Sequence, residues 1–127
     1  MDKFEAQQAF WSSFGVTAFE ENSVPDKPTL KELGISDYIT YQKVNGVFGA
    51  SSMISPNIWT RSATWDRADA LQLAIQRRLE NGGERIFYNG GMIWATPEDG
   101  TSFAQSLGDP NDDMVKRYRL AVVLQFS

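Results

Sequence analysis

The chain has 127 residues, of which 42% are hydrophobic and 13% aromatic, and it contains neither histidine nor cysteine. Its 12 basic and 16 acidic side chains give a formal charge of −4. The length suits a single domain over residues 1–127, with enough apolar side chains for a core. Without histidine or cysteine, catalysis would depend on Asp, Lys or Tyr alone, so we expect a protein that is not an enzyme and needs no cofactor.

The acidic balance predicts no specific binding to nucleic acid, because DNA and RNA attract basic surfaces. No apolar run approaches the ~20 residues that cross a bilayer, and the N-terminus lacks the apolar region of a secretory signal. We therefore expect a soluble protein made in a cytoplasm, with no membrane contact. Because no disulfide can form in this chain, packing or contacts between subunits must supply its stability.

The first residues predict a helix over 2–14. Asp2 is its candidate N-cap, and large side chains recur at helical spacing. They are Phe4, Gln7, Phe10, Trp11 and Phe14. Gly15 ends this helix, and a short strand over 16–19 is expected next. The following segment, 20–34, contains two prolines and several charges, which predicts a surface loop.

Residues 38–44 are aromatic and β-branched, which predicts a strand. Asn45-Gly46 after it is a strong hairpin signal, so we expect a tight turn there with residues 47–48 pairing back. The next residues, 49–52, are small and loosen the chain. Pro56 marks the start of a second strand over 58–63.

A second helix is expected over residues 66–80, with Asp66 as its N-cap. Its apolar stripe consists of Ala68, Leu71, Ile75 and Leu79. Asn81-Gly82-Gly83 ends this helix. Two short strands over 85–88 and 92–95 then flank Asn89-Gly90-Gly91, which predicts a hairpin.

Residues 97–111 have the composition of a loop. The chain closes with a strict period of two, which predicts one long strand over 117–126 with a buried face. That face carries Tyr118, Leu120, Val122, Leu124 and Phe126. The order helix, strands, helix, hairpin, strand predicts an α+β fold, with a mostly antiparallel sheet and two helices packed on one face.

Chemical motifs are weak in this sequence. Asp109, Asn111 and Asp113 match the opening of a calcium loop, but Met114 stands where the loop requires glycine and Leu120 where it requires glutamate. We therefore expect no metal site, and interpret Asp-Pro-Asn as the cap of a short helical turn before the last strand. The glycines match no phosphate-binding pattern, and each has a turn or a helix end to explain it.

Two further groups of side chains are candidates for a functional role. A carboxylate pair for acid–base chemistry would have to join residues 98–99 to 112–113, in a turn-rich segment where carboxylates keep ordinary pKa values. The basic groups are Arg77-Arg78 and Lys116-Arg117 with Arg119, and they suggest solvated helix and strand positions or salt bridges between subunits. The many aromatic side chains suit a core, and they also suit an interface.

The order of elements resembles that of small tail-terminator or tail-completion proteins of long-tailed phages and prophages. The resemblance rests on the N-terminal helix, the Pro-rich segment before Tyr38-Ile39-Thr40-Tyr41, the strand from Ile58 to Ser62, the helix from Asp66 to Glu80, the Ile93-Trp94 hairpin, and the acidic turn from Gly108 to Met114 before the last strand. It departs from many relatives at Asp37, where they have a proline.

The resemblance implies a structural virion protein at the head–tail joint. Such a protein forms a ring, expected to be a hexamer, that caps and terminates the tail tube and docks to the head connector. Its expected partners are copies of itself, the tail tube protein and the head–tail connector protein. It would be assembled in the host cytoplasm, and an acidic lumen would repel passing DNA.

Two other interpretations of the sequence remain open: the protein is another neck or head-completion adaptor, or it is a small acidic inhibitor that binds a host enzyme. If the protein forms a ring, we expect interface residues in two polar loops, 20–37 and 97–113, and on the second helix. The candidates are Asp26, Lys27, Glu98, Asp99, Asp109, Asp112, Asp113, Arg77 and Arg78.

Overall fold

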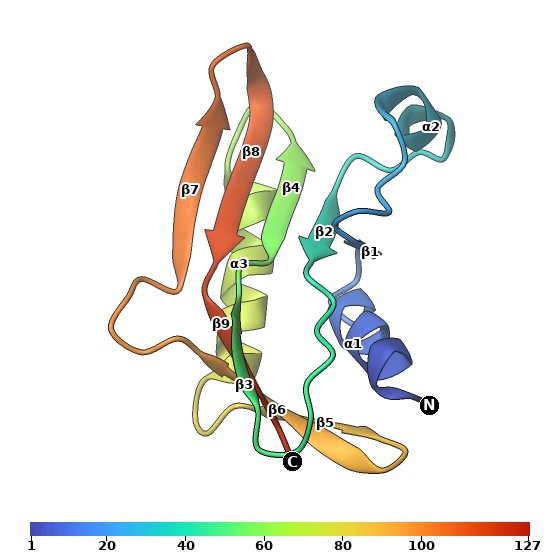
Figure 1. Cartoon of the computed structure of the whole chain (residues 1–127). Coiled ribbons are helices and arrows are strands. Elements are labelled where there is room, and N and C mark those ends of the chain that lie inside the picture. The colour runs from blue at the N-terminus through green and yellow to red at the C-terminus, as the bar shows by residue number, and fades with distance from the viewer.

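A computed structural model describes all residues from 1 to 127. Three helices and nine strands follow along the chain: α1 (Lys3–Ser12), β1 (Thr17–Glu20), α2 (Lys27–Glu32), β2 (Tyr38–Tyr41), β3 (Ser51–Ile54), β4 (Asn57–Arg61), α3 (Asp66–Leu79), β5 (Glu84–Tyr88), β6 (Gly91–Pro97), β7 (Ala104–Asp109), β8 (Asp112–Leu120) and β9 (Val122–Phe126). Figure 1 shows their arrangement.

The strands form two sheets. Sheet A has the order β1-β2-β4-β8-β7, and sheet B has the order β3-β9-β6-β5. Every neighbouring pair is antiparallel except β1 and β2, which are parallel. The predicted α+β fold with mostly antiparallel strands is therefore confirmed, although the strands divide between two sheets.

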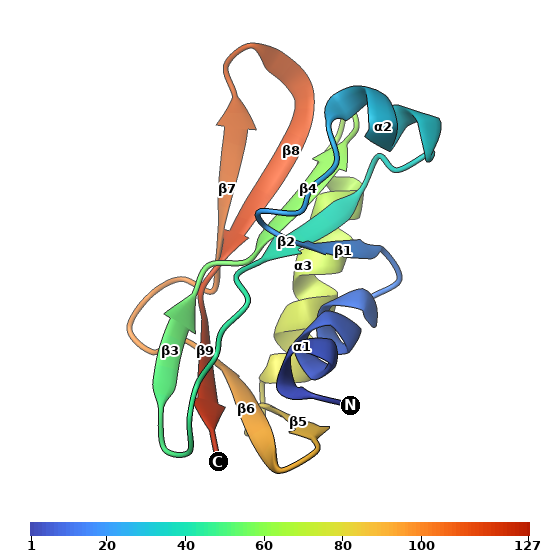
Figure 2. The same cartoon turned by 45° about the vertical axis from the view of Figure 1, so that its right-hand side comes forward.

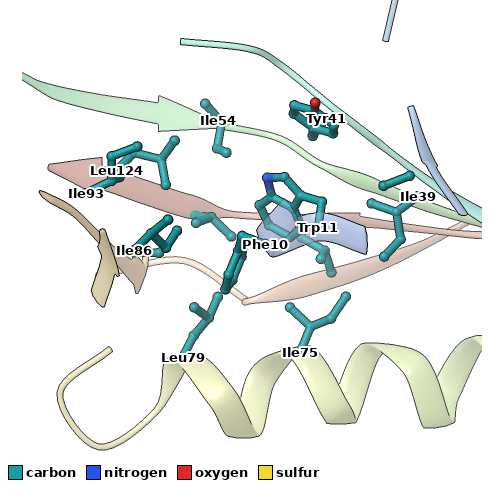
Figure 3. Packing of buried hydrophobic residues seen from close by; sticks show 14 of the residues in the cluster. Phe10, Trp11, Ile39, Tyr41, Ile54, Ile75, Leu79, Ile86, Ile93 and Leu124 are labelled. Carbon is teal, nitrogen blue, oxygen red and sulfur yellow. The ribbon is translucent and has the colours of Figure 1, made fainter. Parts of the chain in front are cut away.

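Helices α1 and α3 pack on the inner faces of the sheets. α1 contacts β1, β2 and β5, while α3 contacts β4, β6 and β8. Figure 3 shows the core between them, where Phe10 and Trp11 of α1 lie among side chains from β2, β3, β5, β6, β9 and α3. No helix lies against the outer face of sheet B, and α2 borders only one end of the outer face of sheet A (Figure 2). This arrangement leaves most of two sheet surfaces open on a small protein.

Helix α1 is the predicted first helix, and a capping box starts it. The Asp2 carboxylate accepts hydrogen bonds from the backbone N–H groups of Phe4 and Glu5 at 2.9 and 2.8 Å. The Glu5 carboxylate accepts one in return from the Asp2 N–H at 3.0 Å. After the helix, Gly15 has a φ of 87°. That conformation favours glycine, but α1 already ends at Ser12 with Ser13 as its C-cap, so the predicted stop at Gly15 is too late in the chain.

The prediction of a loop over 20–34 is wrong, because α2 forms inside it. Asp26 caps this helix, and its carboxylate accepts the N–H of Thr29 at 2.9 Å. Pro28 lies in the first turn, where a proline fits because its missing N–H would have no partner. Leu30 is buried and anchors the helix. The prolines therefore start a helix here instead of preventing one.

The predicted hairpin at Asn45-Gly46 is also wrong. β2 pairs with β1 and β4, whereas β3, formed where we expected small residues to loosen the chain, pairs with β9. The turn lies at 47–50, where the Ala50 N–H donates to the Val47 carbonyl at 2.9 Å and Gly49 has a φ of 84°. Residues 47–48 form no strand, and Phe48 is 85% exposed.

Gly46 has a different reason for being glycine. A Cβ atom at this position would lie 2.2 Å from the Phe126 ring. The segment between β2 and β3 therefore passes directly over the ring of the last core phenylalanine, and only a glycine leaves space for that approach.

Helix α3 has the predicted stripe, and all four of its residues are buried. Its N-cap, however, is Trp65 and not Asp66, and no side chain caps it. The helix ends before Asn81 and Gly82, whose φ angles are 59° and 98°. The β5–β6 hairpin is confirmed, with Tyr88 opposite Gly91 across a two-residue turn.

Two predictions near the C-terminus need correction. Residues 97–111 are not a loop throughout, since β7 forms there and pairs with β8. The acidic segment is the two-residue turn of this hairpin, Pro110-Asn111, and not a helical turn. The last long strand is divided at Ala121 into β8 in sheet A and β9 in sheet B. Ala121 bonds instead to the 98–103 loop, donating to the Phe103 carbonyl at 2.8 Å and accepting from the Glu98 N–H at 3.1 Å.

Candidate functional site

A groove of about 780 Å³ lies between α2 and sheet A, at the end of the molecule where α2 stands beside β4 and β8 (Figure 2). Its lining combines apolar side chains with charged ones. The lining residues are Lys27, Leu30, Lys31, Gly34, Ile35, Ser36, Tyr38, Trp59, Thr60, Arg61, Asp109, Asp112 and Val115. The size is within the usual range for binding sites.

One wall of the groove is a single face of α2. Lys27, Leu30 and Lys31 are spaced by three and four residues, which places them on one side of a helix. The chain then reverses, and the Ile35 N–H donates to the Leu30 carbonyl at 2.9 Å. This bond closes the end of α2 and sets Ile35 beside Leu30 in the wall.

The other wall belongs to the open face of sheet A, where aromatic rings lie side by side. The Phe19 and Tyr38 ring centroids are 5.8 Å apart, and those of Tyr38 and Trp59 are 6.1 Å apart with planes inclined by 16°. The Arg117 guanidinium lies 4.7 Å from the Trp59 ring centroid. Tyr38, Trp59 and Arg117 are opposite one another in the strand register, so they share this face.

Hydrogen bonds fix the direction of these side chains. The Trp59 indole N–H donates to Thr40 Oγ1 at 2.9 Å, and Arg117 Nε donates to Asn57 Oδ1 at 2.9 Å. Both acceptors belong to the same sheet, so the aromatic and arginine side chains are held in place before any partner arrives. Such preorganisation lowers the entropic cost of binding.

Ion pairs at the rim use some of the charged groups. Arg61 donates to Asp112 at 2.7 Å, and this hydrogen bond is the main reason why the pKa of Asp112 is lowered. The Met114 N–H and the positive charges of Arg61 and Lys27 lower that pKa further. Arg67 pairs with Asp37 at 2.7 Å, which raises the pKa of the guanidinium. The three ion pairs of the protein include neither Lys27 nor Lys31.

The groove brings together candidates from the two predicted loops. Lys27 comes from the first loop, and Asp109 and Asp112 come from the second. Asp26 is next to them as the cap of α2, where its bonds to Thr29 lower its pKa. Asp113 is in the same β7–β8 hairpin, and its carbonyl accepts a hydrogen bond from Lys116. The two loops thus meet although they are far apart in the sequence.

The acidic turn has no metal-site arrangement. Asp109 accepts the Asn111 N–H at 2.9 Å, and Asp112 is engaged with Arg61. Nowhere in the chain do three carboxylates gather in a group that could hold a metal ion. The side chains of the turn are therefore used to shape the hairpin.

Glu98 and Asp99 lie elsewhere, in the loop between β6 and β7. Asp99 lines a second hollow, of about 430 Å³, together with Glu80 and Trp94. No Lys or Arg lines this hollow. Because Asp112 lines the groove and Asp99 lines this separate hollow, the acid–base pair considered above does not form.

The two arginine candidates on α3 differ. Arg77 is exposed and forms no ion pair. Arg78 is half-buried and engaged with its neighbours: it donates to Glu84 at 2.7 Å and to Ser13 Oγ at 2.6 Å, and its guanidinium lies 4.5 Å from the Phe14 ring centroid. It connects α3 to the end of α1 and to β5.

The sequence reasoning missed the apolar residues of the groove. Tyr38 and Trp59 were counted as strand and core residues, and Leu30 and Ile35 were placed in a loop. The alternation in β4 carried a signal, since Ile58 and Thr60 are buried while Trp59 between them is only partly covered. A period of two shows that one face is outward, but not that the outer face stays free of helices.

Tyr118 and Asp69 form the most perturbed titratable contact. The Tyr118 hydroxyl donates to the Asp69 carboxylate, and this bond, with burial, raises the pKa of Tyr118 to about 12. A phenol with so high a pKa keeps its proton, which suits a structural donor. The contact ties α3 to β8 rather than providing a base.

No family model matches the chain, and neither the curated proteins nor the solved structures contain a match. No helix of the structure is long and apolar enough to cross a membrane.

Proposed function

We propose that this protein is a structural virion subunit at the head–tail joint, which forms a ring that caps the tail tube and docks to the head connector. One observation carries the proposal: the outer face of sheet B is free of helices, and large apolar side chains remain exposed there. On sheet B and the adjoining turn these include Val47, Phe48, Met53 and Phe87, which are 72%, 85%, 71% and 69% exposed. Exposed apolar groups of this kind mark surfaces that other proteins cover.

The chemistry of the groove supports the same choice. Two of its three hydroxyl groups are engaged, since Thr60 donates to the Lys116 carbonyl at 3.0 Å and Ser36 to Asp37 at 3.4 Å, and Tyr38 carries the third. Its carboxylates bond to Arg61 and to backbone N–H groups. With an aromatic and arginine-rich wall, the groove has the composition of an interaction surface.

The first test is the size of the purified protein. Sedimentation velocity over a wide concentration range should show a species several times the mass of one chain, and negative-stain electron microscopy should show closed rings. A protein that remains monomeric at every concentration and binds one host protein would contradict this proposal. It would favour the interpretation as an inhibitor of a host enzyme.

The second test is made in an infected or induced host. Removal of the gene should leave heads and tails unjoined, with tail tubes of irregular length. Joined particles with tails of normal length would contradict the proposal.

A further inference from the structure

The groove and the sheet face beside it form a basic surface on an acidic protein. We define this basic surface as the groove lining together with Arg117 and Arg119, which continue the open face along β8. It contains five of the 12 basic side chains and two of the 16 acidic ones. Seven basic and fourteen acidic side chains therefore remain for the rest of the chain. A surface of this kind attracts an acidic partner.

Within the basic surface, two cations have no partner. Arg61 is paired with Asp112, whereas Lys27 and Lys31 form neither ion pairs nor side-chain hydrogen bonds. Both stand on the groove side of α2, beside Leu30 and Ile35. The groove thus offers two ammonium groups that form no ion pair, although Lys27 is close enough to Asp112 to lower the pKa of that carboxyl.

An acidic surface without partners exists on the same chain. Glu98 and Asp99, in the 98–103 loop, form no ion pair, and Asp99 lines the second hollow with Glu80. Trp94 and Pro97 provide apolar contact area there. We call Glu80, Glu98 and Asp99 the acidic edge. Its three carboxylates have no basic side chain in the lining of that hollow.

The groove at α2 and the acidic edge lie apart in the molecule. Figures 1 and 2, which differ by a 45° turn, both place α2 at the upper right and the loop between β6 and β7 at the lower left. One copy therefore cannot bring its own acidic edge to its own groove. A second copy can, and the contact then repeats from copy to copy in a head-to-tail manner.

We propose that a second copy of this chain docks its 98–103 loop into the groove, with Glu98 and Asp99 facing Lys27 and Lys31. The inference rests on the proposed function, because it supplies the contact that would close the ring. Nucleic acid is a poorer occupant, since the net charge of −4 repels a polyanion at long range. Fixed aromatic and arginine side chains beside the lysines supply the rest of the contact area.

Charge reversal provides the test. The groove variant is K27E/K31E, the loop variant is E98K/D99K, and the combined variant carries all four changes. Sedimentation velocity should show that each double variant weakens self-association by about tenfold or more. The combined variant should recover self-association, because the charges of the groove and of the loop are then both reversed. Association of the wild type should also weaken at high salt, since Lys27, Lys31 and Asp99 are exposed and Glu98 is only half-buried before contact.

A matched control is K43E, compared with K27E alone: the two variants change the net charge by the same amount, and Lys43 is exposed and lies outside the groove. K43E should associate like the wild type, and circular dichroism should show all variants folded. An equal loss of self-association in this control would overturn the inference. The inference would also fail if the combined variant did not recover self-association.

Two outcomes separate this inference from the proposed function. If the wild type forms rings and both double variants form them equally well, the docking inference fails and the proposed function stands. If the wild type is monomeric at every concentration, both fail. Binding of single-stranded DNA by the wild type, lost in K27E/K31E, would reassign the groove and overturn the contact between copies.

Discussion

Gln7 and Val44 exchange two hydrogen bonds. The Gln7 side-chain amide donates to the Val44 carbonyl at 2.8 Å, and its oxygen accepts the Val44 N–H at 2.9 Å. Gln7 is 1% exposed, so its polar side chain lies in the core. It supplies Val44 with the two hydrogen bonds that a neighbouring strand would otherwise provide. This exchange holds the irregular segment between β2 and β3 against α1.

Replacing Gln7 with Met should therefore destabilise the protein by about 2 kcal/mol. Met has a similar length, but it leaves the N–H and carbonyl of Val44 without partners in a partly buried place. Urea denaturation measures the change. Gln125→Met, on the exposed face of β9, should have little effect. Equal stability of the two variants would show that water satisfies Val44.

Replacing Gly46 with Ala should cost about 1–3 kcal/mol, because the new methyl group would meet the Phe126 ring. Gly108→Ala is the control, since nothing lies within 4 Å of a Cβ there. Thermal melting compares the two. The loss caused by Gly46→Ala should be smaller in a Phe126→Leu background than in the wild type, and an equal loss in both backgrounds would place the cause elsewhere.

Replacing Arg78 with Ala should destabilise the protein by about 1 kcal/mol, through the lost contacts with Phe14, Ser13 and Glu84. Arg77→Ala should stay within about 0.5 kcal/mol of the wild type, as expected for an exposed helix position. Chemical denaturation of both variants tests the difference. A larger loss for Arg77 would reverse the roles assigned to the pair.

Replacing both Leu71 and Ile75 with Asp should unfold the domain, since both side chains are buried and each new carboxylate would be charged in the core. Leu73→Asp, on the exposed side of α3, should remain folded. Loss of a cooperative melting transition is the measurement. A double variant that melts cooperatively would mean that α3 presents another face to the core.

The Tyr118 contact predicts a dependence on alkaline pH. The pKa of Tyr118 is raised from 10.0 to about 12, so its contribution is complete below pH 10 and is lost as the pH rises towards 12. The stability advantage of the wild type over Tyr118→Phe should be constant below pH 10 and should shrink above it. An advantage that does not change up to pH 12 would contradict the bond to Asp69.

Elements with a clear period were predictable from the sequence, and those that depend on a distant partner were not. The stripe of α3 and the alternation of β9 are properties of neighbouring residues, and both were confirmed. In β8 the predicted alternation is incomplete, because Tyr118 is only partly buried. β7 was missed because its residues, Ala104 to Asp109, have weak strand preference and form a strand only against β8. Pro28 suggests a loop when taken alone, and the sequence analysis did not predict that Asp26 is the N-cap of a helix that has Pro28 in its first turn.

The candidate site was predictable only in part. Charged residues in two polar segments were named as candidates, and three of them line the groove: Lys27, Asp109 and Asp112. The aromatic wall was not foreseen, because no local pattern shows which sheet face remains without a helix. Arg78 was chosen for its charge, but its place between α1 and β5 depends on how the helices pack.

The division of the last strand at Ala121 has a consequence for folding during synthesis. β8 lies between β4 and β7, and β9 lies between β3 and β6, so each fills a central position in its sheet and is made after both of its neighbours. Until these residues leave the ribosome, β3, β4, β6 and β7 have no partner on that side. Neither sheet can be completed early, and the nascent chain must keep several strand edges unpaired until the final segment arrives.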